Sequence, residues 1–214
     1  GHLLIHEEYR AGRQHGAWAL YFTNGRRAHD GQYVSDRKHG VWRSWYESGQ
    51  QSFEAHYQEG RRDGPWTYWY EDGTPWKQGA YAKGIATGTW RMWYRNGRPH
   101  QVGDYVEGRK SGLWTWWFAD SGESKRGSFV DGVEDGEWTW WYETGQVKSR
   151  GWFLEGQLHG EWMSWFPNGE KQVHGEYLDG MLHGRWERWT EDGLLAEVCR
   201  YRESREIECR AAGQ

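Results

Sequence analysis

The chain has 214 residues, of which 19 are Trp and 31 are Gly, whereas isoleucine occurs only at Ile5, Ile85 and Ile207. Aromatic rings must therefore supply the apolar surface that Leu, Ile and Val supply in an ordinary core. With 27 basic and 31 acidic side chains, the formal net charge is −4. A charge of this sign and size gives no long-range attraction to nucleic acid, so we expect no nucleic-acid partner.

The first residues, 1–8, precede the repeats described below and are interpreted as an N-terminal lead-in. They begin GHLLIHEE with no initiator Met, which indicates that the native N-terminus lies further upstream and leaves an export signal or a lipid anchor open. No run reaches the roughly 18 apolar residues of a membrane span. We therefore expect no transmembrane segment and a cytoplasmic location, with export as the alternative.

A repeat of 24 residues occupies residues 9–201. Its marker is a Gly-x-Trp pair that occurs eight times with the same spacing, followed by a second Trp in seven copies. A column that is filled in every copy has the same role in every copy, so these rings are expected to be structural. The markers lie at Gly16/Trp18, Gly40/Trp42, Gly64/Trp66, Gly88/Trp90, Gly112/Trp114, Gly136/Trp138, Gly160/Trp162 and Gly184/Trp186.

Two turn signals divide each repeat. One is a dipeptide such as Asn24-Gly25, and the other is a longer EGRRDG-type segment such as Glu59–Gly64. The segments between them are rich in Trp, Tyr, Thr and Val, which favour strands, and they have no helical periodicity. We therefore predict an all-β fold: an elongated single-layer antiparallel β-meander of eight hairpins, with about sixteen strands.

Glycine recurs two residues before a Tyr or Phe in most repeats. Without a side chain, it allows a neighbouring ring to lie flat over the backbone. We expect this arrangement at Gly31, Gly79, Gly103, Gly127, Gly151 and Gly175.

The repeat pattern fades after Tyr201, because Glu208 and Arg210 stand where a ninth Gly and Trp would fall. Residues 202–214 are interpreted as a C-terminal cap or frayed tail. Cys199 and Cys209 lie near this end; two cysteines are too few for a disulfide scaffold, and they form no CxxC pair.

The columns G-x-W-x-x-W-Y-x-x-G and G-x-Y-x-x-G resemble MORN repeats (membrane occupation and recognition nexus). The match is nearest to the bacterial variant that is often called the YwqK-family antitoxin. The resemblance covers residues 9–201. It implies an elongated antiparallel sheet that serves protein contacts, oligomerisation or lipid binding.

Motifs of catalysis are missing from the sequence. It has no G-x-S-x-G elbow, no P-loop and no G-x-G-x-x-G, and Arg10 replaces the second His of an HExxH motif in HEEYR. Histidines recur at His15, His39, His159 and His183, but equivalent residues of adjacent repeats should lie about 10 Å apart. Zinc–nitrogen bonds are only about 2.0–2.1 Å long. We therefore expect no enzyme, no catalytic residue, no metal site and no cofactor.

One column varies between repeats. This column holds an aromatic residue or Met in the middle copies, whereas Ser44 and Ser164 occupy it in two other copies. Two additional Trp lie outside the columns that recur in every repeat. Two interpretations remain open: better packing at the centre of the array, or an exposed aromatic strip that binds a partner. The candidate binding residues are Tyr68, Met92, Trp116, Trp140, Trp76 and Trp152.

These observations favour a non-catalytic scaffold for protein–protein contacts or self-association, because Trp and Tyr are enriched among the residues that dominate binding energy. An antitoxin or immunity role is a special case of this hypothesis. The alternative is a glycan- or lipid-binding module in which exposed rows of Trp and Tyr stack on the ligand.

Overall fold

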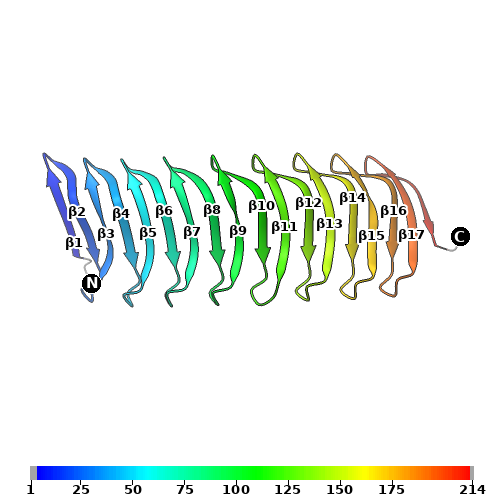
Figure 1. Ribbon diagram of the computed structural model, residues 1–214, viewed down its shortest axis with the longest axis horizontal. Helices are drawn as coiled ribbons and strands as arrows, with labels where there is room; N and C mark the ends of the chain where they lie inside the picture. The colour runs from blue at the N-terminus through cyan, green and yellow to red at the C-terminus, as the bar shows by residue number, and fades with distance from the viewer. Residues whose placement is uncertain (1–3, 213–214) are drawn as a thin grey trace. The chain divides into compact units, whose positions relative to one another are not determined.

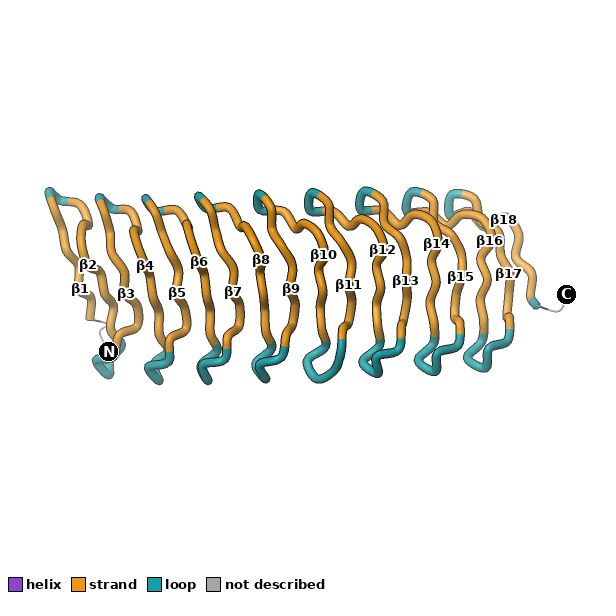
Figure 2. Tube along the Cα trace, viewed as in Figure 1, coloured by secondary structure: helices purple, strands orange, loops and turns teal. Residues whose placement is uncertain are grey.

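The computed structural model describes residues 4–212, and all regular secondary structure in that range consists of β-strands (Figure 1). Figure 2 shows the same range as strands joined by loops. The all-β prediction is therefore confirmed. The chain divides into two compact units, Gly1–Arg109 and Lys110–Gln214, which we call the first unit and the second unit.

The first unit is an antiparallel meander in which each strand pairs with the next one along the chain. Its strands are β1 (Leu4–Arg10), β2 (Arg13–Tyr21), β3 (Arg27–Val34), β4 (Arg37–Trp45), β5 (Gln51–Gln58), β6 (Arg61–Trp69), β7 (Pro75–Ala82), β8 (Ile85–Trp93) and β9 (Pro99–Val106).

The second unit repeats this meander. Its strands are β10 (Arg109–Trp117), β11 (Glu123–Val130), β12 (Val133–Trp141), β13 (Val147–Leu154), β14 (Gln157–Trp165), β15 (Lys171–Leu178), β16 (Met181–Trp189), β17 (Leu195–Arg202) and β18 (Arg205–Ala211).

The described residues form 18 strands, two more than the sequence predicts. The additional strands lie in the segments that the sequence analysis set outside the repeats. Residues 4–10 pair with β2, and residues 205–211 pair with β17. The first three residues of the lead-in and the last two of the C-terminal segment lie outside the described residues.

The second type of turn is shorter than predicted. Glu59 and Gly60 alone connect β5 to β6, with φ angles of 48° and 81°. Two successive left-handed residues form the type I′ turn, whose twist matches that of the flanking strands. The residues Arg61–Gly64 belong to β6 rather than to a long turn. The prediction of a six-residue turn is therefore wrong in length.

Five repeat Trp pack over a glycine of the preceding strand, at five of the six glycines for which the sequence predicts this contact. A Cβ placed on Gly79 would lie 2.1 Å from the Trp90 ring, closer than any real side chain could come. Ala55 occupies this position opposite Trp66 and is fully buried. The ring-over-glycine contact recurs at Gly31, Gly79, Gly127, Gly151 and Gly175.

The last hairpin replaces this contact with a covalent bond. Cys199 stands in the glycine column on β17, and it is joined by a disulfide to its cross-strand partner Cys209 on β18. Cys199 is buried, whereas every residue of β18 is exposed. The disulfide is therefore the main side-chain anchor of a strand that lacks the repeat Trp.

We expect the Cys199→Ala/Cys209→Ala variant to lose hydrogen-exchange protection in residues 205–211 while β17 stays protected. A disulfide that closes a short loop contributes about 2–3 kcal/mol, here to β18 alone. Mass spectrometry of exchanging peptides measures the effect, and reduction of the parent protein should reproduce it. Unchanged protection of β18 in both samples would contradict this role of the disulfide.

Candidate functional site

The repeat Trp residues gather on one face of each unit, which we call the aromatic face. In the first unit, Trp66 lies 5.9 Å from Tyr57 and 5.0 Å from Tyr81, measured between ring centroids. In the second unit, Trp138 is 3% exposed and lies 5.2 Å from Phe129. The contacts of Trp66 with Tyr81 and of Trp138 with Phe129 are edge-to-face, which stabilises aromatic pairs beyond the area that they bury. The repeat Trp therefore form the packed layer of each unit.

The candidate residues of the first unit lie on this aromatic face. Tyr68 contacts Trp66 at 6.1 Å and Phe53 at 4.8 Å, and its pKa is raised mainly by burial. Trp76, which is 42% exposed, reaches Tyr68 at 5.5 Å. Met92 is half-buried on β8. Tyr68 and Trp76, with Phe53, line a shallow hollow of about 340 Å³.

The candidate residues of the second unit divide between the two faces. Trp116 is 8% exposed and packs 5.8 Å from Trp138, so it belongs to the packed layer. Trp140 is half-buried, 5.9 Å from Trp138 and 5.6 Å from Trp162. Trp152 follows Gly151, which lies under Trp162, so strand alternation places it on the opposite, polar face. The structure therefore does not bring Trp152 together with Trp116 and Trp140.

Among the described residues, five cations lie over the rings of the aromatic faces, and none of them was predicted as a site residue. Lys77 Nζ lies 4.8 Å from the centroid of Trp90, and Lys125 Nζ lies 4.4 Å from that of Trp116. Both distances are within the range of cation–π attraction. The 24-residue period could have revealed these cations, because they occupy only two columns. One column holds Lys38, Arg62 and Lys110, and the other holds Lys77 and Lys125.

The two lysines of the second column lie between candidate binding residues. Lys77 pairs with Tyr68 on β6 and with Met92 on β8. Lys125 pairs in the same way with Trp116 and Trp140. In each unit, therefore, a lysine lies on the strand between two candidate residues of neighbouring repeats.

A model of the MORN repeat variant family matches residues 38–59, 62–83, 134–151 and 158–179. The four matches start at the same phase of the 24-residue period. The chain contains MORN-variant repeats. The remaining copies carry the same Gly-x-Trp marker at the same spacing.

Other comparisons add no functional assignment to the MORN repeats. No curated protein sequence matches the chain. Among solved structures, the chain is similar to part of the GtfA/B complex bound to UDP and GlcNAc, with 12% identity over 56% of this chain and 23% of that chain. The TM-score of 0.25 is too low to support an argument. In the described range, no helix has the length and apolarity that a membrane span requires.

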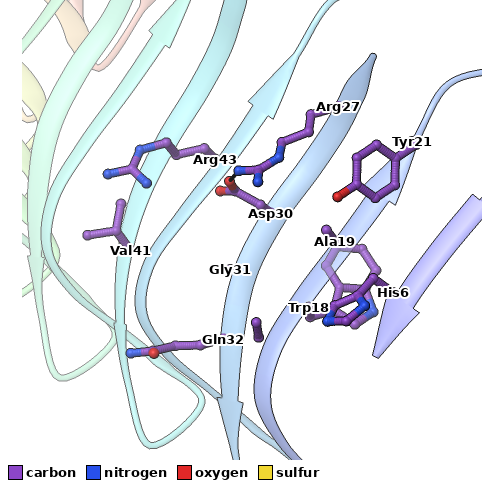
Figure 3. A pocket seen from close by; sticks show the side chains of 11 residues that line it. His6, Trp18, Ala19, Tyr21, Arg27, Asp30, Gly31, Gln32, Val41 and Arg43 are labelled. Atoms are coloured by element: carbon purple, nitrogen blue, oxygen red, sulfur yellow. Dashed lines mark hydrogen bonds and ion pairs between the residues drawn. The ribbon is translucent and has the colours of Figure 1, made fainter. Parts of the chain in front are cut away.

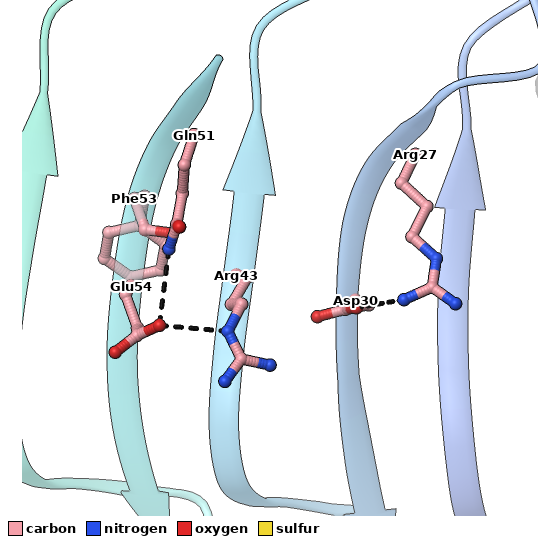
Figure 4. Close-up of polar contacts among 6 residues, drawn as sticks. All are labelled: Arg27, Asp30, Arg43, Gln51, Phe53 and Glu54. Carbon is pink, nitrogen blue, oxygen red and sulfur yellow. Dashed lines mark hydrogen bonds and ion pairs between the residues drawn. The ribbon is translucent and has the colours of Figure 1, made fainter. Parts of the chain in front are cut away.

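The polar faces of the MORN repeats carry paired charges. In the first unit, Arg43 Nε lies 2.9 Å from Glu54 Oε2, and Arg27 lies 2.7 Å from Asp30 (Figure 4). Arg27, Asp30 and Arg43 also line a depression of about 580 Å³ (Figure 3). Because both arginines are paired with carboxylates, their charges are balanced within the first unit.

The polar face of the second unit has a smaller groove of about 430 Å³ beside Trp152, which is 50% exposed. Glu137 pairs across the strands with Trp152, and its carboxylate lies 3.0 Å from Arg150. Glu161 also lines the groove. The groove thus combines one exposed indole ring with hydrogen-bond donors and acceptors.

The described residues contain one group of potential metal ligands, Glu197, Cys199 and Cys209, with atoms within 4.8 Å of one another. Both sulfur atoms belong to the disulfide. Metal binding by cysteine requires a thiolate, so this group has only the Glu197 carboxylate to offer while the disulfide is intact.

Proposed function

We propose that this chain is a non-catalytic scaffold that binds a protein partner through the aromatic faces of its MORN repeats. The observation that carries the proposal is the presence of half-buried residues beside packed Trp in each unit, namely Tyr68 and Met92 in the first unit and Trp140 in the second. Other repeats hold Ser44 and Ser164 in this column, so the sheet does not require a ring there. Rigid rings on a fixed sheet lose little conformational entropy on binding, which suits them to anchor a partner.

An antitoxin- or immunity-like role is the narrower form of this proposal, with a toxin as the bound protein. Its support is the resemblance to the bacterial MORN variant. We place the protein in the cytoplasm as part of the same proposal. Self-association of the chain uses the same face and competes with the partner.

A glycan is the second candidate ligand, and it is favoured by the groove beside Trp152. The exposed indole offers a flat surface for a sugar ring, and Glu137, Arg150 and Glu161 can exchange hydrogen bonds with hydroxyl groups. This site lies on the polar face, so the two candidate functions are separable by mutation.

The Tyr68→Ser/Trp140→Ser variant is expected to lose binding to its protein partner by about 30-fold or more, a loss typical of hot-spot residues. The residue introduced at both positions is Ser, which the same column already contains at Ser44 and Ser164. The partner is identified by cross-linking and mass spectrometry, purified, and titrated by calorimetry. Circular dichroism and thermal melting establish that the variant is folded.

Trp152→Ser is the matched control, because it removes an exposed ring from the opposite face. It should leave the affinity for the protein partner unchanged. A partner that binds the Tyr68→Ser/Trp140→Ser variant normally would contradict the aromatic-face proposal. Glycan-array binding that Trp152→Ser abolishes would support the second candidate instead.

A further inference from the structure

The cations of the aromatic faces differ from those of the polar faces in their partners. On the polar faces, Arg43 and Arg150 each lie within about 3 Å of a carboxylate. Within the described residues, no ion pair is formed by Arg62, Lys77, Lys110 or Lys125. Each of these four cations lies over an aromatic ring instead.

Lys110 and Lys125 converge on one indole from neighbouring strands. Lys110 Nζ lies 5.1 Å from the centroid of Trp116, and Lys125 Nζ lies 4.4 Å from the same centroid. Lys110 also lies 4.8 Å from Phe129. Two ammonium groups over a single ring repel each other, and the rings below them exclude water. An anion between the two lysines would relieve this repulsion.

The electrostatic environment of Lys110 agrees with this geometry. Burial lowers the pKa of Lys110, and the nearby charge of Lys125 lowers it further, whereas Glu134 raises it. Glu134 acts from β12 without forming an ion pair with Lys110 in the described structure. Glu134 therefore affects the pKa of Lys110, but it is not paired with this lysine.

The first unit has a corresponding pair. Arg62 Cζ lies 4.4 Å from the centroid of Tyr81, and Arg62 Nη1 donates a hydrogen bond of 2.9 Å to the Tyr81 hydroxyl. Burial lowers the pKa of Lys77, and the charge of Arg62 adds to this effect. Arg62 occupies the repeat column of Lys110, and Lys77 occupies that of Lys125. The same two columns therefore place two cations over aromatic rings in each unit.

We propose that these cation pairs bind carboxylate side chains of an acidic segment in the protein partner. Lys110 and Lys125 form the site of the second unit, and Arg62 and Lys77 form that of the first. The inference rests on the proposed scaffold function and specifies the chemistry of the partner. Each site accepts an Asp or Glu carboxylate between two cations, while the rings beside it contact the apolar residues of the segment.

A protein carboxylate suits this surface better than a polyanion such as nucleic acid or an anionic membrane. Polyanions bind through many cations that act together, whereas each aromatic face carries only a few cations set among rings. The net charge of −4 also opposes long-range attraction to a polyanion. A single carboxylate with apolar neighbours is complementary in charge and polarity to one pair of cations that lies over aromatic rings.

The test uses the full chain and a short peptide in which Glu alternates with Leu, with a peptide of alternating Gln and Leu for comparison. We expect the Glu peptide to bind and the Lys110→Gln/Lys125→Gln variant to weaken that binding by about tenfold, the size of a lost charge-assisted contact. Lys110→Arg/Lys125→Arg should keep the affinity, because it keeps both charges. Calorimetry measures binding, and NMR shifts of the lysine side chains locate it.

Lys171→Gln is the matched control, since Lys171 is an exposed lysine that lies 5.6 Å from the ring of a different Trp column. It should bind the Glu peptide as the parent does. Equal binding of the Gln peptide, or an equal loss in Lys171→Gln, would overturn the proposal. The chain could also bind phosphatidylserine vesicles more tightly than the Glu peptide and lose this binding in Lys110→Gln/Lys125→Gln. That result would overturn the proposal and indicate that the bound anion is a lipid headgroup.

The purified partner separates this inference from the scaffold proposal. If Tyr68→Ser/Trp140→Ser loses the partner and Lys110→Gln/Lys125→Gln binds it normally, the scaffold proposal stands and the carboxylate site is wrong. If neither variant loses the partner, both proposals fail. Loss in both variants supports both.

Discussion

Replacing Gly127 by Val is expected to destabilise the second unit by about 3 kcal/mol or more, a severe case of overpacking. A Cβ at this position would lie 2.0 Å from the Trp138 ring. Trp138 cannot move away, because it is 3% exposed and held between Phe129 and Trp140. The unfolding midpoint in urea, followed by circular dichroism, measures the loss.

Two substitutions make this result specific to the ring contact. Gly122→Ala should leave the midpoint unchanged, because a Cβ there meets no atom within 4 Å. The unfolding midpoint of Gly127→Ala should lie between those of the parent and Gly127→Val, since Ala55 already occupies the equivalent place opposite Trp66. A midpoint for Gly127→Val equal to that of Gly122→Ala would show that the ring does not lie over the glycine.

Removing the ring itself should cost about 3–5 kcal/mol, the usual loss when a buried Trp becomes Ala. We expect this for Trp138→Ala. The variant loses edge-to-face contacts with Phe129 and Phe153, whose rings lie 5.2 and 5.9 Å away. It also leaves a cavity over Gly127, which the neighbouring strands cannot close. Chemical denaturation of the full chain measures the free energy of unfolding.

Trp152→Ala is the control for this experiment. Trp152 is one strand away on the polar face and is 50% exposed. Its removal should change the free energy of unfolding by less than about 0.5 kcal/mol, as for most surface substitutions. Equal losses from Trp138→Ala and Trp152→Ala would contradict the distinction between a packed aromatic face and an open polar face.

The hairpins, the Trp ladder and the ring-over-glycine contacts could be predicted from the sequence, because their residues recur at a fixed spacing of 24 residues. A column that contains Gly in most repeats beside a column of Trp indicates a steric constraint, and Gly79 under Trp90 is an example of it. The two edge strands could not be predicted in this way. The residues of β1 and β18 lack the repeat pattern and are held through pairing with β2 and β17.

The candidate site was only partly predictable, since exposure and face depend on local register. Trp76 contacts Tyr68 because the pairing slips between Tyr68 and Trp69, which adds a residue to β7 at that point. Trp116 and Trp140 occupy the same column, yet Trp116 is buried and Trp140 is half-buried. Two lysines over Trp116 help to explain this difference.

The sequence by itself determined the class of fold, the repeat length and the residues that pack, because a strict 24-residue period repeats the same local sterics eight times. Only the tertiary structure decided which rings are open to a partner and which cations stand beside them. Those properties depend on contacts between neighbouring strands, such as Lys125 between Trp116 and Trp140. Turn length and strand register decide which residues are cross-strand neighbours. In this protein the two-residue turns and the recurrent bulges determine that register.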